Sequence, residues 1–80
     1  MKARALLTFD TYVHTYTHVK SRDVLSALQA DGWRPVAQRG SHLQLKHPTK
    51  SGRVTVPHPK ADLAVGILRS IERQSGVKLR

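Results

Sequence analysis

Two short runs in which apolar and polar residues alternate strictly constrain the fold of this chain most. Residues 42–47 have the sequence His-Leu-Gln-Leu-Lys-His, and residues 53–56 have the sequence Arg-Val-Thr-Val. Successive side chains of a β-strand point to opposite faces, so each run predicts a strand with one apolar and one polar face. The turn-forming residues 48–52 separate the two strands. The apolar face holds Leu43, Leu45, Val54 and Val56, and the polar face holds His42, Gln44, Lys46, Arg53 and Thr55.

A third strand is expected over residues 34–39, joined to the next strand by a turn through Arg39, Gly40 and Ser41. Because Pro35 has no N–H to donate, this strand should lie at an edge of the sheet or begin after the proline. Trp33 or Val36 is expected to contribute to the core from this part of the chain.

A helix is predicted on each side of the strands. The first spans residues 21–30, with Ser21 as an N-cap whose hydroxyl accepts a hydrogen bond from a free backbone N–H. Gly32 follows it as a C-terminal cap residue. The second helix is expected over residues 63–75, with Gly76 beyond its end and Gly66 allowing close packing against the sheet. Its apolar stripe consists of Leu63, Ile67, Leu68 and Ile71.

The order of these elements predicts an α+β fold in which two helices cover one face of a three-stranded antiparallel sheet. A domain of 80 residues buries only about 60% of the surface of its unfolded chain, so its core must be thin. We therefore expect a substrate to bind on a surface, on the sheet face that the helices leave open.

Residues 1–18 differ from the compact domain expected over residues 19–80. The stretch 11–19 is rich in β-branched and aromatic residues and alternates at strand period. Three interpretations stay open for this N-terminal extension: an added edge strand, a loose tail, or an upstream stretch included by a wrong choice of start site.

The charge of the chain points to a polyanionic partner. Fourteen Lys and Arg residues against five acidic residues give a formal net charge of +9 at pH 7. Between Gly32 and Ala61 every charged residue is basic: Arg34, Arg39, Lys46, Lys50, Arg53 and Lys60. Such a block favours binding to a phosphate backbone. The alternatives are a solvated basic surface and a field that steers an acidic protein.

The composition excludes several classes of protein. The chain contains no cysteine, which excludes a disulfide framework, a zinc thiolate site and a cysteine nucleophile, and which fits the cytoplasm. The apolar run Ala5-Leu6-Leu7 is too short for a signal-peptide core or a membrane span. We expect neither a cofactor nor a membrane partner.

Five motifs in one order resemble the HicA-type toxins. They are Ser21-Arg22-Asp23-Val24-Leu25, Asp31-Gly32-Trp33, Gly40-Ser41-His42, Lys46-His47-Pro48 and Val54-Thr55-Val56-Pro57-His58-Pro59. The tail Leu68-Arg69-Ser70-Ile71 with Gly76 also fits, while Ala64 stands where the family often has proline. The resemblance covers residues 19–80 and is specific because the motifs share the family's order and spacing.

This resemblance implies a fold similar to double-stranded-RNA-binding domains. It also implies an endoribonuclease that cuts translated mRNA and that a HicB-type antitoxin neutralises. The histidine of the family's Gly-Ser-His motif is its catalytic residue, and it corresponds to His42.

His42 suits this chemistry because imidazole titrates near neutral pH. It would take the proton of a ribose 2′-OH, whose oxygen then attacks the adjacent phosphorus without a metal. Since DNA lacks this hydroxyl, DNA should not be cut, and direct binding of DNA is not expected either. Gly40 lets the backbone approach a phosphate. The candidate RNA-binding residues are Arg39, Gly40, Ser41, Gln44, Lys46 and Arg53. The sequence does not identify a general acid.

The other histidines are expected to have different roles. His47 is expected to be buried and hydrogen-bonded, and His58 to orient a loop or contact RNA. His14 and His18 lack further ligands, so no metal site is expected. Two alternatives to a ribonuclease remain: a non-catalytic RNA-binding module with a basic sheet face, and an interaction protein that docks an acidic partner.

Overall fold

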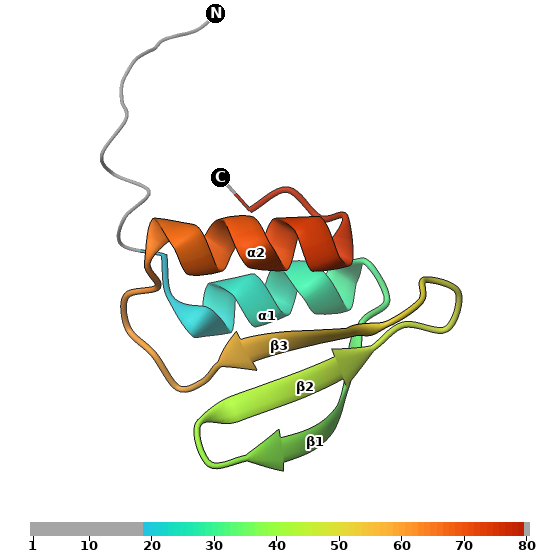
Figure 1. Ribbon diagram of the computed structural model, residues 1–80, viewed down its shortest axis with the longest axis horizontal. Helices are drawn as coiled ribbons and strands as arrows, with labels where there is room; N and C mark the ends of the chain where they lie inside the picture. Colours follow the sequence, from blue (N-terminus) through green and yellow to red (C-terminus); the bar gives the residue numbers. More distant parts are fainter. Residues whose placement is uncertain (1–18, 80) are drawn as a thin grey trace, which may run out of the picture.

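The structure, a computed structural model, describes residues 19–79, so the edge strand considered for the N-terminal extension lies outside the described residues. Within them the chain forms α1 (Ser21–Ala30), β1 (Arg34–Arg39), β2 (His42–Lys46), β3 (Arg53–Pro57) and α2 (Val65–Ser75), as Figure 1 shows. This order confirms the predicted α+β fold. None of these helices is long and apolar enough to cross a membrane.

The three strands form one antiparallel sheet in the order β1-β2-β3. β2 and β3 pair without interruption, from His42 opposite Pro57 to Lys46 opposite Arg53. β1 is an edge strand, which confirms the prediction made from Pro35, and its pairing with β2 is irregular between Pro35 and Ala37. In Figure 1, β1 is the strand farthest from both helices.

Both helices lie on the same side of the sheet, over the apolar side chains of β2 and β3 (Figure 1). The buried hydrophobic residues are Val24, Leu25, Leu28, Trp33, Leu45, Val54, Val56, Leu63, Leu68 and Ile71. Leu43 is partly buried against this core. Of the two candidates near β1, Trp33 is fully buried while Val36 is 51% exposed, so the core contribution comes from Trp33.

The start of α1 corrects one prediction. Lys20 is the N-cap and has no side-chain cap hydrogen bond, while Ser21 is the first helical residue and is 2% exposed. The Ser21 hydroxyl is therefore not a helix cap. It bonds instead to the segment that follows β3, because that segment passes directly beside the first turn of α1.

The start of α2 differs from the prediction in a related way. The helix begins at Val65, and Leu63 fills the core from the connecting segment, where its N–H donates to the Val19 carbonyl at 2.9 Å. Ile67 is 40% exposed, so it does not belong to the buried stripe. Gly66 faces open space, with no atom within 4 Å of a Cβ placed there, so its expected role in close packing is wrong.

His47 follows the last residue of β2 and links this end of the sheet to the C-terminal end of α1. Its Nε2 donates to the Asp31 carbonyl at 2.6 Å, and its Nδ1 accepts the N–H groups of Thr49 and Lys50, each at 3.1 Å. Its ring also meets the Trp33 ring edge-on, with 5.2 Å between centroids. These bonds confirm the structural role expected for His47.

Candidate functional site

The open face of the sheet consists of three cross-strand rows of side chains. Residues paired directly across antiparallel strands point to the same face, with Cα atoms about 4.5–5.5 Å apart. The first row is Arg39, His42 and Pro57; the second is Ala37, Gln44 and Thr55; the third is Arg34, Lys46 and Arg53. Basic side chains therefore lie at both ends of this face, with polar and small residues between them.

His42 lies at one end of the face, immediately after a two-residue hairpin turn. Gly40 has φ 55°, a left-handed conformation that glycine adopts at no steric cost and that such turns require. The Gly40 carbonyl accepts a hydrogen bond from the Gln38 amide at 3.2 Å, and no atom lies within 4 Å of a Cβ placed on Gly40. The turn is thus held in shape while the space beside Gly40 stays open.

The imidazole of His42 differs from those of the other described histidines. Within residues 19–79, His47 has both ring nitrogens in hydrogen bonds, and His58 has its Nδ1 bonded to the Ser21 hydroxyl. His42 is exposed, and its ring makes no hydrogen bond to any described residue. Toward the described part of the chain, both of its ring nitrogens are therefore unengaged and open to a bound substrate.

The structure groups the candidate residues in two sets. Arg39, Gly40 and Ser41 lie beside His42, at the same end of the sheet. Lys46 lies four residues further along β2, about 13 Å away at about 3.3 Å per residue, in the same row as Arg53. Gln44 lies between the two ends, and its Oε1 accepts a hydrogen bond from Arg53 at 2.8 Å. Lys46 is therefore too far along the strand to share one phosphate with His42, whereas Arg39 is beside it.

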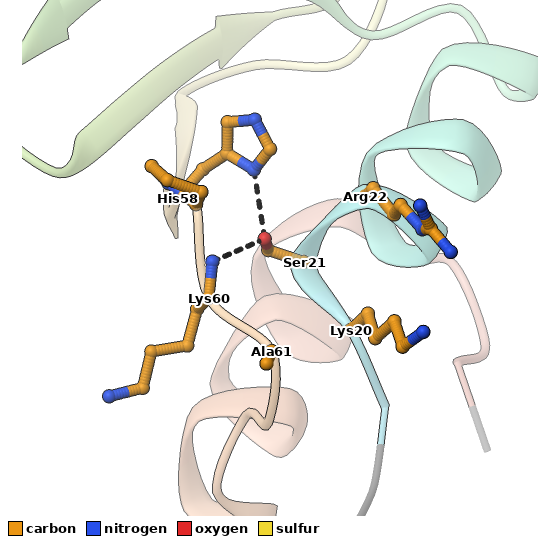
Figure 2. Close-up of a pocket in the computed structure, with 7 residues that line it drawn as sticks. Lys20, Ser21, Arg22, His58, Lys60 and Ala61 are labelled. Atoms are coloured by element: carbon orange, nitrogen blue, oxygen red, sulfur yellow. Dashed lines mark hydrogen bonds between the residues drawn. The ribbon is translucent and has the colours of Figure 1, made fainter.

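Ser21 and His58 support the turn that carries His42. The His58 N–H donates to the Ser41 carbonyl at 2.7 Å, and the His58 ring bonds through Nδ1 to the Ser21 hydroxyl at 2.8 Å (Figure 2). The same hydroxyl accepts the Lys60 N–H at 2.8 Å. His58 therefore orients a loop, one of the two roles expected for it. Sequence reasoning missed Ser21, because no local pattern connects residues that lie 37 positions apart.

Within residues 19–79, no acidic residue belongs to the three rows of this face. Asp31 follows α1, and the Lys50 ammonium, bonded to its Oδ2 at 2.6 Å, holds the pKa of that carboxyl below its usual range. Within residues 19–79, no three His, Cys, Asp or Glu side chains are placed to hold a metal ion together. The described residues at the His42 end of the sheet supply an imidazole, the Arg39 guanidinium, the Ser41 hydroxyl and backbone N–H groups.

Comparisons with known proteins address the whole domain. A family model described as "HicA toxin of bacterial toxin-antitoxin" matches residues 21–77, which include every helix and strand described above. The chain is also similar to a solved structure, the "HicA3 and HicB3 toxin-antitoxin complex", with 27% sequence identity and a TM-score of 0.69. That similarity covers 78% of this chain and 100% of the other. Comparison with curated protein sequences gives no match.

Proposed function

Since the chain belongs to the HicA family of toxins from bacterial toxin–antitoxin systems, we propose that it is a metal-independent endoribonuclease that cuts mRNA in the cytoplasm, with His42 as its catalytic base. The observation that carries this proposal is the free, exposed imidazole of His42 beside Arg39, at the end of a basic sheet face. The other two described histidines have ring nitrogens engaged in bonds that hold the fold.

In the proposed reaction, His42 takes the proton of the ribose 2′-OH, and the 2′-oxygen forms a bond to the adjacent phosphorus. The bond from phosphorus to the 5′-oxygen breaks, and this oxygen takes a proton supplied through solvent. The products are a 2′,3′-cyclic phosphate and a 5′-hydroxyl. A base at this position contributes about 10²–10⁴-fold to the rate in comparable enzymes.

Arg39 is the best-placed group to stabilise the charge that develops on the nonbridging oxygens. It lies directly opposite His42, and its guanidinium offers several donors in a planar fork. The Ser41 hydroxyl and the open space beside Gly40 allow a phosphate to approach closely. Gln44, Lys46 and Arg53 then contact the RNA further along the sheet, through backbone phosphates and bases.

The test of the catalytic role is His42→Ala, with Arg73→Ala on the far side of the molecule as the charge control. Purified protein is mixed with RNA in EDTA, and the cut ends are analysed. We expect His42→Ala to lower the cutting rate about 10²–10⁴-fold while RNA binding and the melting temperature stay unchanged. Arg73→Ala should cut at the original rate, since Arg73 lies in the last turn of α2.

The product ends give an independent check. We expect a 2′,3′-cyclic phosphate and no cutting at a position that carries a 2′-deoxyribose. Unchanged cutting by His42→Ala, or products with a 5′-phosphate, would contradict the proposal. Tight RNA binding without cutting by the unmodified protein would favour the RNA-binding module instead.

The proposed partner is a HicB-type antitoxin. The similar HicA3 chain is in a complex with HicB3, and we propose that this chain binds a related antitoxin. An antitoxin that covers His42 would exclude RNA from the open sheet face. Addition of the antitoxin should then reduce RNA binding and RNA cutting in parallel.

A further inference from the structure

A pocket of about 360 Å³ lies between the first turn of α1 and the segment that follows β3 (Figure 2). It is lined by Lys20, Ser21, Arg22, His58, Pro59, Lys60 and Ala61. Three of these residues are basic and none is acidic, so the pocket favours an anion. None of its residues belongs to the open sheet face described above.

The walls of this pocket are fixed by hydrogen bonds that converge on Ser21. The Ser21 N–H donates to the Lys60 carbonyl at 2.9 Å, and the Ser21 hydroxyl accepts the Lys60 N–H at 2.8 Å. The bond from Ser21 to the His58 ring adds a third link between the walls. Since both walls are already held in place, a ligand would have to order only the cationic side chains as it binds.

The cationic groups around the pocket are available to a ligand. Figure 2 shows Lys20 and Arg22 extending from the α1 side and Lys60 extending from the opposite segment. Within residues 19–79, these three side-chain head groups form no hydrogen bond and no ion pair. Their positive charges together raise the electrostatic potential at the pocket, which attracts an anion.

The pocket adjoins the candidate catalytic row. Pro57 lies opposite His42, and the next residue, His58, lines the pocket and bonds to the Ser41 carbonyl. RNA carries a phosphate on every nucleotide. A strand bound at His42 has further phosphates on either side of that position, and this pocket would take one of them.

We propose that this pocket is a phosphate-binding subsite for the RNA substrate, with Lys20, Arg22 and Lys60 as its cationic ligands. The inference rests on the proposed function, because it takes RNA as the substrate at His42. The pocket adds affinity and fixes the position of the strand, and it takes no part in proton transfer.

The test compares two double variants that each remove two positive charges. Arg22→Gln with Lys60→Gln changes the pocket, and Arg69→Gln with Arg73→Gln changes exposed positions on α2. Both are made in the His42→Ala background, so that RNA stays intact while the Kd for a single-stranded oligoribonucleotide is measured at several salt concentrations.

We expect the pocket variant to raise the Kd about tenfold or more and to reduce the slope of log K against log salt by about 0.7–1.4, since each contact to a single-strand phosphate contributes about 0.7. The α2 variant should leave the slope nearly unchanged. Equal melting temperatures of the two variants show that the fold is intact. Arg22→Gln alone, at an exposed position, should give about half of the change in slope.

Two results would overturn the subsite. The first is an unchanged Kd and salt slope in the pocket variant. The second is unchanged RNA binding with lost affinity for a HicB-type antitoxin, which would make the pocket a protein-docking site. Failure of the proposed function is recognised separately, because the chain with His42 intact would then cut no RNA.

Discussion

At the scale of single residues, glycine 32 shows how one position joins two parts of the fold. Gly32 has φ 109°, and a Cβ placed on it would lie 2.7 Å from the Nε2 of His47. His47 in turn bonds the Asp31 carbonyl and packs on the Trp33 ring. Each residue of the Asp31-Gly32-Trp33 motif thus contacts or makes room for the His47 ring.

Gly32→Ala should therefore lower the free energy of unfolding by about 2 kcal/mol or more, from backbone strain and from displacement of the His47 ring. Gly66→Ala is the matched control, because Gly66 lies inside α2 facing open space. It should raise the free energy of unfolding by about 0.5–1 kcal/mol through helix propensity. Urea unfolding measures both values, and equal effects of the two changes would contradict this account.

At the scale of the elements, the pairing of the strands places the basic residues of the sheet at two separate ends. Arg39 is opposite His42, while Lys46 is opposite Arg34 and Arg53 at the other end. A side chain that stabilises the transition state has to reach the reacting phosphate, whereas one that only binds RNA contacts any phosphate of the strand.

Arg39→Ala is thus expected to lower kcat about 10²-fold, with a smaller change in KM. Lys46→Ala is expected to raise KM several-fold and to leave kcat within about twofold, because it removes binding shared by the ground state and the transition state. Steady-state cutting of one oligoribonucleotide measures both parameters. The opposite pattern would place the reacting phosphate at the Lys46 end of the sheet.

At the scale of the whole molecule, the described residues share one hydrophobic core. Among them, every buried hydrophobic residue lies between Val24 and Ile71. The two ends of the sheet are joined to the helices by different hydrogen-bond clusters, one around His47 and one around Ser21 and His58. The remaining described histidine, His42, is left free on the open face.

Deletion of residues 1–18 should consequently leave a folded toxin domain. A chain that starts at Val19 is expected to melt within about 2 °C of the full chain, because it keeps every buried hydrophobic residue of the described part of the chain. Thermal unfolding followed by circular dichroism measures this, and the rate of RNA cutting gives the matching functional result. A drop of more than about 8 °C would show that the extension packs on the domain.

The sequence alone determined the order of the elements and the two faces of the sheet, since both follow from spacing within a few residues. It singled out His42 through the resemblance of Gly40-Ser41-His42 to the motif of the HicA family. Only the tertiary structure decided that α2 starts later than expected and that Val36 and Ile67 are exposed. It also decided that the Ser21 hydroxyl bonds to the His58 ring. It also placed Arg39 rather than Lys46 beside His42 and formed the basic pocket from segments about 40 positions apart. The physical reason is that periodicity describes which face of its own element a side chain occupies, whereas hydrogen-bond partners and row neighbours depend on how separate elements pack together.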